Sequence, residues 1–525
     1  MRRALLGVCA AGTLILPAPG HASQLALVVF LPPTSLRAAL DAPLPGSLAR
    51  AGGVGLLTAP GQGDPVAAAR AAIPAGMVVE DPGLLLRRVG EAAGPVVVLV
   101  IAPLDGSERR DVALLILARG DPQRLFYAHG PIRGLTSDTT RRPGLVSTAD
   151  LPEALGTGRG AGSTIRVEGA PPFRLVDRYR ALAPLRAPAG LTVLGLALLG
   201  LVMGIALMFG RAPRPRILRA AGGLGLFAVA LPVALLPAAA LPRPSALSVA
   251  GVALGGGAIL AWAAHRVAGP GPAAMAVVAG AGMGVVIVDG FLGWPGMLMP
   301  LIGGSAFEGS RMYGLGNGYG GLLVAGAVLA ASRLRPVPGV LLLAAAGLLG
   351  GLPGFGANLG VATTLFVAAG AWLALRVLGG PRLLPVAAGA GLAAAGVAAV
   401  LAIHRAADLP THVTRVLEAA GRSGLGEILD VYVRRLALNL EGTAASPAAW
   451  LVLVALPVAL VMAWRRSRPF GSALTADPGW RDAVVVLAVA SMAGYLANDT
   501  IGVAGMGFVY VAAALVYPSL AMRWT

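Results

Sequence analysis

The chain has no lysine, a single cysteine and few charged residues of any kind. Only 12% of its 525 residues are charged and 56% are hydrophobic, whereas roughly a quarter of the residues of a soluble globular protein are charged. This deficit of charge excludes an ordinary soluble protein and predicts a polytopic membrane protein. The one cysteine, Cys9, lies in a segment expected to be a leader, so disulfides and thiol chemistry are excluded for the mature chain.

The net positive charge therefore comes from arginine alone. The 41 arginines outnumber the 24 acidic residues, which gives a net charge of +17. They are scattered at the ends of apolar runs and do not form one basic face. This distribution is typical of membrane topology and not of a nucleic-acid-binding surface. We expect membrane lipids as partners, and no nucleic acid.

The first 22 residues have the pattern of a signal peptide. Arg2 and Arg3 precede an apolar core of residues 4–16, which Pro17 and Pro19 end before a small-x-small cleavage site at 20–22. The apolar core is short for a membrane span of roughly 20 residues. An uncleaved anchor is the alternative interpretation.

Residues 23–186 differ from the rest in composition and predict a compact α/β domain, exported behind the leader. Short apolar runs separated by charges, prolines and turn residues are typical of strands buried on both faces of a parallel or mixed sheet. The expected strands are 25–31, 96–102 and 112–118, and the expected helices lie around 65–75 and 82–93.

The segment LTSDTTRRPGLVSTADLPEALG, residues 135–156, carries a resemblance to known proteins. A purely local interpretation is that Asp150 caps a short helix and that Glu153 completes a capping box. The same segment resembles the C-terminal part of the alkaline phosphatase and sulfatase superfamily core. Its lead-in TTRRPG, residues 139–144, resembles more narrowly a set of bacterial polytopic membrane proteins that carry such a domain before many helices.

That resemblance implies a site with two metal ions held by Asp and His ligands, and a Ser or Thr nucleophile after the first strand. The first expected strand here ends in Leu31, Pro32 and Pro33, where an acidic ligand is expected, and His129 is the only histidine between residues 23 and 186. We therefore expect a degenerate, non-catalytic domain that binds no metal and no cofactor.

Residues 187–525 predict a multi-helix transmembrane domain. Alternation from an exported N-terminal domain places the arginine-rich loops in the cytoplasm, which satisfies the positive-inside rule and leaves the C-terminus cytoplasmic in a bacterial inner membrane. About eleven spans are expected: 190–209, 220–241, 246–264, 273–291, 319–331, 340–352, 361–375, 384–403, 448–463, 483–497 and 501–520.

The most polar stretch between these apolar runs is FEGSRMYGLGNGYGG, residues 307–321. Residues 309–317 resemble a GARYYGIGNE motif of the same bacterial membrane proteins, residues 356–360 resemble their GA[DN]xGG turn, and Asn498 with Asp499 resembles their NDSG element. Gly318 stands where that motif has a glutamate, so no catalytic role is carried over to this position. By alternation, all these motifs fall at extracytoplasmic helix ends.

Polar groups that converge at membrane depth predict a site for an anionic or glycan-like ligand. The candidate binding residues are Asp289, Glu308, Arg311, Tyr313, Asn317, Asn358, His412 and Asp499. Asp289 and Glu308 are candidate ion-pair partners of Arg311. The alternative is that these residues only satisfy backbone groups at broken helix ends. Within residues 404–446, spacings of three and four predict amphipathic helices on the outer membrane surface.

The leading functional hypothesis is an outward-facing polar site that handles a lipid-linked or anionic substrate of the cell envelope. An enzymatic version would be a transferase that uses a lipid-phosphate donor. A transporter or flippase, and a structural partner of an envelope complex, are the alternatives. The sequence leaves the substrate and the oligomeric state open.

Overall fold

The computed structural model describes the core elements of the N-terminal region and most of the helical region. The described residues are 25–30, 38, 45, 48–50, 53–58, 64–74, 77–79, 88, 96–103, 113–120, 135–137, 140, 145–147, 150–151, 165–167, 173–209, 214–306, 313–379, 382–407, 426–450, 453, 457, 474–498 and 500–524. Two compact units divide the chain: Met1–Arg180 with Ser305–Tyr313, and Ala181–Gly304 with Gly314–Thr525. The domain boundary expected after residue 186 lies inside a helix, α7 (Phe173–Phe209).

The first unit contains a six-stranded mixed sheet in the order β3-β1-β4-β5-β2-β7. Strands β1, β3 and β4 are parallel, β5 is antiparallel to both of its neighbours, and β2 and β7 are parallel. A separate antiparallel pair is formed by β6 and β8. The strands are β1 (Leu25–Phe30), β2 (Gly53–Thr58), β3 (Val78–Val79), β4 (Val96–Pro103), β5 (Ala113–Gly120), β6 (Leu135–Ser137), β7 (Leu145–Ser147) and β8 (Ile165–Val167).

The three expected strands are confirmed, and β4 shows why their apolar runs are continuous. Residues 96–102 of β4 are all buried, as they are in a strand covered on both faces. Helix α3 (Pro65–Ala72) confirms the first expected helix, and Asp64 caps it by accepting the N–H of Val66 at 2.8 Å. The second expected helix, 82–93, lies almost wholly outside the described residues, as does Glu153.

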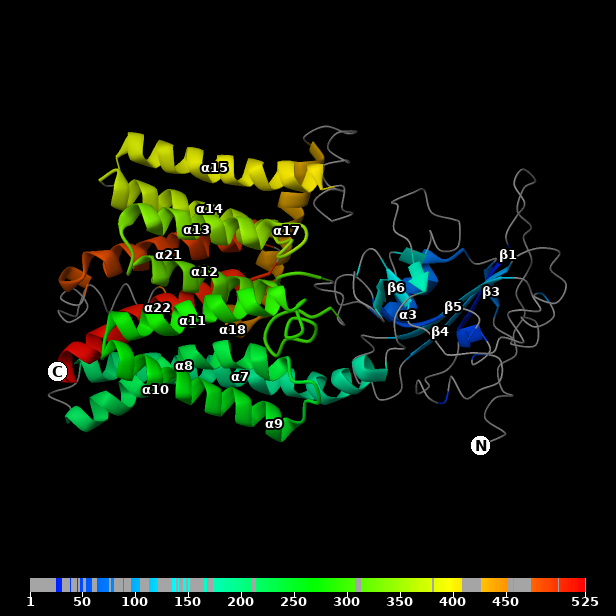
Figure 1. Ribbon diagram of the computed structural model, residues 1–525, viewed down its shortest axis with the longest axis horizontal. Helices are drawn as coiled ribbons and strands as arrows, with labels where there is room; N and C mark the ends of the chain where they lie inside the picture. Colours follow the sequence, from blue (N-terminus) through cyan, green and yellow to red (C-terminus); the bar gives the residue numbers. More distant parts are fainter. Residues whose placement is uncertain are drawn as a thin grey trace. The chain divides into compact units, whose positions relative to one another are not determined.

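The second unit is a set of long apolar helices (Figure 1). Within the described residues, eight helical segments are long and apolar enough to cross a membrane, and α12 and α13 are apolar but shorter. The expected span at 448–463 lies mainly outside the described residues, so the count of eleven stays a prediction. Besides α7, the helices are α8 (Pro215–Ala239), α9 (Ala246–Ala250), α10 (Gly256–Ala268), α11 (Pro272–Phe291), α12 (Asn317–Ala331), α13 (Pro336–Gly351), α14 (Leu359–Trp372), α15 (Leu383–Ala406), α17 (Gly426–Ala445), α18 (Pro447–Trp450), α21 (Pro478–Ala497) and α22 (Gly502–Trp524); η3 (Gly251–Gly255) joins α9 to α10, and η4 (Leu373–Val377) extends α14.

The outer helices expose large apolar side chains, which identifies the surface that faces lipid. On α15, Leu383 and Leu384 are 88% and 79% exposed, and on α10 Val267 is 83% exposed. Such side chains are stable at a helix surface when the surrounding medium is hydrocarbon and not water. Together with the membrane-length helices, this arrangement makes the chain an integral membrane protein.

Helix α12 has the opposite character, because it is buried on every side. All of its residues except Asn317 and Ala330 are buried, and it packs against α11, α13, α14, α21 and α22. Glycines make this close packing possible: a Cβ added to Gly321 would lie 2.7 Å from the Cβ of Met506, and one added to Gly326 would lie 2.8 Å from the Cβ of Met283. Figure 1 shows α12 among these neighbours.

Ion pairs join the C-terminal end of α12 and the end of α14 to the start of α21. Arg333 lies 2.6 Å from Asp477, the N-cap residue of α21, and Arg376 lies 3.3 Å from Asp482 in its first turns. Asp482 is buried and also accepts hydrogen bonds from Arg481 at 2.9 and 3.0 Å. We call this the arginine end of the bundle, and the end where α12, α14 and α22 begin the amide end.

Candidate functional site

Asp289, the first predicted site residue, organises the turn that follows α11. Its carboxylate oxygens accept the N–H groups of Gly296 at 2.7 Å and Met297 at 3.2 Å, and its carbonyl accepts the N–H of Trp294 at 2.7 Å. Asp289 is only 5% exposed. The carboxylate satisfies two backbone N–H groups of the turn, so Asp289 has a clear structural role here.

The described backbone between α11 and α12, residues 292–306 and 313–316, is not helical, and side chains from elsewhere satisfy some of its polar groups. Trp294 has a positive φ of 65°, and its indole Nε1 donates to the carbonyl of Phe355 at 3.1 Å. Arg186, on α7, donates from Nε to the carbonyl of Pro300 at 3.0 Å and from Nη2 to the carbonyl of Gly303. Non-helical backbone in a membrane protein is stable only where protein or water supplies such partners. Helix α12 begins directly after this segment, at Asn317.

Three helices begin next to one another at the amide end, and three polar side chains link them. The Asn358 amide donates to the Asn317 side-chain oxygen at 3.0 Å, and the Asn317 amide donates to the Thr500 hydroxyl at 2.9 Å. Asn317 is the first residue of α12, Asn358 is the N-cap of α14, and Thr500 lies two residues before α22. We call Asn317, Asn358 and Thr500 the amide cluster.

Asn358 is central to the cluster because its side chain both caps α14 and binds the residues that precede and begin α12. Its side-chain oxygen accepts the N–H of Val361 at 3.1 Å, which caps α14, while its amide nitrogen also donates to the carbonyl of Leu315 at 2.9 Å. The residue is 3% exposed. Its side chain therefore has little freedom, and it fixes the positions of Leu315 and Asn317 before α12.

The starts of α12 and α22 are in direct backbone contact. A Cβ added to Gly502 would lie 3.0 Å from the backbone nitrogen of Gly318 and 3.2 Å from the Cβ of Asn317, so no larger residue fits at Gly502 without a shift. Gly316, at the N-cap of α12, offers no side chain that could cap the helix. Helix N-termini carry partial positive charge and N–H groups with no partner inside the helix. Convergence of three of them creates a positive region suited to an anionic group.

A second polar layer joins α17 to the end of α21. The Asn439 amide donates to the carbonyls of Tyr495 at 2.7 Å and Asn498 at 2.6 Å, and the Thr443 hydroxyl lies 3.0 Å from the Tyr495 hydroxyl. Asn498 itself is buried and closely approaches Gly360, near the start of α14. The second layer thus adjoins the amide cluster.

Helix α17 confirms one of the amphipathic helices expected within residues 404–446. Among the residues of α17 whose burial is described, Asn439 and Thr443, one helical turn apart, are buried, whereas Val433 and Leu440 are 58% and 55% exposed. Two polar side chains of α17 therefore pack against the protein. Exposed apolar side chains on the same helix suit a helix that lies in a membrane interface.

Two buried polar atoms in this region have no hydrogen-bond partner within the described part of the chain. They are the side-chain oxygen of Asn439 and the hydroxyl of Tyr319 in the first turn of α12. Buried polar atoms are nearly always paired in folded proteins. These two positions are therefore suited to contact with a polar ligand or with water.

The structure brings together only part of the predicted site. Asn317 and Asn358 are in direct contact, Asp289 holds a separate turn, and Tyr313 is half-buried and belongs to the other compact unit. Glu308, Arg311, His412 and Asp499 lie outside the described residues, so the ion pairs proposed for Arg311 remain predictions.

Sequence reasoning missed Arg186, Asn439 and Thr500, which contribute side chains to the amide end. Only Thr500 had a local signal, since it directly follows the Asn498-Asp499 motif. Within the described residues no group of three or more His, Cys, Asp or Glu side chains is placed to hold a metal ion. Comparison with models of protein families, with curated proteins and with solved structures found no match to this chain.

Proposed function

We propose that this integral membrane protein binds the anionic group of a lipid-linked substrate of the cell envelope at its amide end. The observation that carries the proposal is the hydrogen-bonded meeting of the starts of α12, α14 and α22 through Asn317, Asn358 and Thr500. Three helix N-termini attract negative charge, and side-chain amides and hydroxyls donate hydrogen bonds to phosphate oxygens. A lipid phosphate combines this charge with an apolar tail that the surrounding membrane accommodates.

Orientation and location are part of the same proposal. The expected leader and the arginines at the opposite end of the bundle support an extracytoplasmic amide end in a bacterial inner membrane. The resemblance to bacterial membrane proteins that carry a phosphatase-like domain supports a role in the envelope, with the sheet unit of this chain as a degenerate, non-catalytic ectodomain. A transferase reaction with a lipid-phosphate donor is the enzymatic form of this proposal.

The test compares two ligands that differ only in the phosphate. Farnesyl phosphate and farnesol are titrated into the purified full chain, and binding is measured by calorimetry. We expect the phosphate to bind and the alcohol to bind far more weakly. Equal binding of the two ligands would contradict an anion site and leave only a hydrophobic one.

Asn317→Asp separates a ligand site from a purely structural cluster. The carboxylate can still accept from Asn358, and the Thr500 hydroxyl can rotate to donate to it, so the local geometry is retained. Negative charge at a helix N-terminus stabilises the fold by about 0.3–1 kcal/mol. A bound phosphate about 4 Å away would be repelled by about 1–4 kcal/mol, depending on the effective dielectric constant.

We therefore expect Asn317→Asp to weaken farnesyl phosphate binding by about fivefold to several hundredfold without lowering the melting temperature. The matched control is Ser245→Asp, which adds the same charge at the N-cap of α9, where Ser245 already caps the helix. It should leave binding unchanged. Normal binding by a folded Asn317→Asp variant would reject the site.

Transport is the second candidate, because one feature specifically favours it. Helices α12 and α13 are shorter than a full span, and non-helical backbone precedes the N-terminus of α12. Many transporters bind anionic groups at the N-termini of such discontinuous helices. Reconstituted vesicles that carry a fluorescent lipid phosphate in one leaflet distinguish the two candidates: a transporter moves the lipid across, whereas a binding protein or transferase does not.

A further inference from the structure

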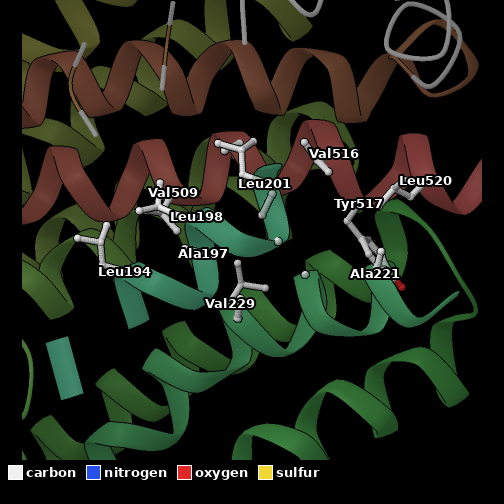
Figure 2. Close-up of a pocket in the computed structure, with 16 residues that line it drawn as sticks. Leu194, Ala197, Leu198, Leu201, Ala221, Val229, Val509, Val516, Tyr517 and Leu520 are labelled. Carbon is white, nitrogen blue, oxygen red and sulfur yellow. The ribbon is translucent and has the colours of Figure 1, made fainter. Parts of the chain in front are cut away.

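A second region of the bundle has properties that the amide end does not explain: an apolar cavity between α7, α8 and α22, near the arginine end. The empty space among its lining residues is about 570 Å³, which includes space that is open to the surroundings. Figure 2 shows Leu194 and Leu201 of α7, Val229 of α8, and Val509 and Leu520 of α22 around this space.

Glycines on facing helices create the cavity. Gly200 on α7 and Gly225 on α8 both line it: a Cβ added to Gly200 would lie 3.4 Å from the Cα of Gly225, whereas one added to Gly225 would meet no atom within 4 Å. Every side chain of the lining is apolar except Tyr517, which lies at the end of the cavity near Leu520. The occupant must therefore be apolar along most of its length.

The length of the cavity matches one acyl chain. Along α22 its lining runs over twelve residues, from Val509 to Leu520, which corresponds to about 16 Å of helix. The hydrocarbon core of a bilayer is about 30 Å thick, so each leaflet contributes about half of that length. A lipid tail from one leaflet is therefore long enough to lie along the lining from one end to the other.

Positive charge lies near one end of the cavity. Arg219 precedes the lining residue Ala221 on α8, Arg523 follows Leu520 on α22, and Arg216 is one turn before Arg219; Arg216 and Arg219 are exposed. The Arg523 guanidinium donates to the carbonyl of Leu207 at the end of α7. Residues 178–288 and 500–525 contain no Asp or Glu, so no acidic side chain of these segments neutralises the arginines.

We infer that this cavity holds one acyl chain of an anionic phospholipid whose phosphate lies against Arg219 and Arg523. Basic pockets between membrane helices bind anionic lipid headgroups through the same chemistry. The site is at the arginine end, so it is distinct from the proposed substrate site at the amide end. Each proposal can fail without the other.

The experiment counts lipids that remain on the protein. The full chain is reconstituted in nanodiscs of equal parts phosphatidylglycerol and phosphatidylcholine, released in mild detergent and analysed by native mass spectrometry. We expect one phosphatidylglycerol per chain to be retained in preference to phosphatidylcholine. Retention of neither lipid, or of both in proportion to their supply, would overturn the inference.

Gly225→Leu fills the cavity, and Gly223→Leu is its matched control on the same helix, at an exposed position that does not line the cavity. Both changes raise helix propensity equally. Gly225→Leu should lose the retained lipid while its melting temperature is equal to the wild type or higher, and Gly223→Leu should keep it. Equal retention by both variants would show that the lipid is bound elsewhere.

The headgroup contacts are tested with the double variant Arg219→Gln and Arg523→Gln. It should still retain one lipid but should lose about 30-fold in preference for phosphatidylglycerol, since each arginine near an anionic headgroup contributes about 1 kcal/mol. Arg266→Gln, at the exposed end of α10, is the control that should keep the preference. If Gly225→Leu instead converted a dimer to a monomer, a second copy of the chain and not a lipid would occupy the cavity.

Discussion

Replacing Asn358 tests how strongly the amide cluster determines the fold. Asn358→Ala removes the cap of α14 and both hydrogen bonds that its amide donates, to Leu315 and Asn317. Loss of an N-cap costs about 0.5–2 kcal/mol. Each buried carbonyl or amide oxygen that loses a donor adds about 1–3 kcal/mol. Since neighbouring groups relax in part, we expect a total loss of about 2–5 kcal/mol in the free energy of unfolding.

Asn358→Ser separates the contribution of the helix cap from that of the two hydrogen bonds that the Asn358 amide donates. A serine hydroxyl can still cap α14 but cannot reach Leu315 and Asn317, so this variant should recover about 1 kcal/mol relative to Asn358→Ala. The control is Ser245→Ala, which removes an exposed cap at the start of α9 and should cost only about 1 kcal/mol. The expected order of thermal stability in detergent is wild type, Ser245→Ala, Asn358→Ser and then Asn358→Ala. Wild-type stability for Asn358→Ala would refute the argument that this side chain joins the helix ends.

Other changes probe the bundle elsewhere. Asp482→Asn weakens ion pairs at the arginine end and should cost about 1–3 kcal/mol in thermal unfolding, less than a fully buried pair because its partners are partly exposed; an unchanged melting temperature would show that these pairs contribute nothing. Gly321→Ala should destabilise the packing of α12 on α22, whereas Gly223→Ala, in open space, should not. A reporter fused after Arg216 should be cytoplasmic and one near Gly424 extracytoplasmic; a cytoplasmic Gly424 would contradict the topology. The purified full chain should contain no stoichiometric zinc, and metal-dependent phosphate ester hydrolysis would show that the sheet unit is catalytic.

Hydrophobic patterns were sufficient to predict most of the elements. The apolar runs at 25–31, 96–102 and 112–118 became β1, β4 and β5, because a strand covered on both faces requires continuous apolar sequence. The membrane helices were likewise visible as apolar runs. Sequence alone did not indicate that α12 is central while α15 is peripheral, because their compositions are alike and only packing distinguishes them.

Part of the site was predicted from the sequence and part was not. Asn317 and Asn358 were expected at one end of the bundle, and the structure links them directly. Asn439 was not predicted, because it lies within the amphipathic pattern of α17 and acts on Tyr495 and Asn498, more than 50 residues away in sequence. Its partners depend on how distant helices pack, which no local periodicity encodes.

The burial of α12 has a consequence for how the protein is made. A helix of 15 residues extends about 22 Å, less than the roughly 30 Å of the hydrocarbon core. Such a segment is poorly retained by the bilayer alone, whereas α15 and α7 are long and face lipid. During biogenesis the surroundings of α12 are therefore complete only after α21 and α22 have been synthesised, and these helices begin about 160 and 185 residues after the start of α12. Truncation before α21 should leave α12 exposed to the quality-control proteases of the membrane.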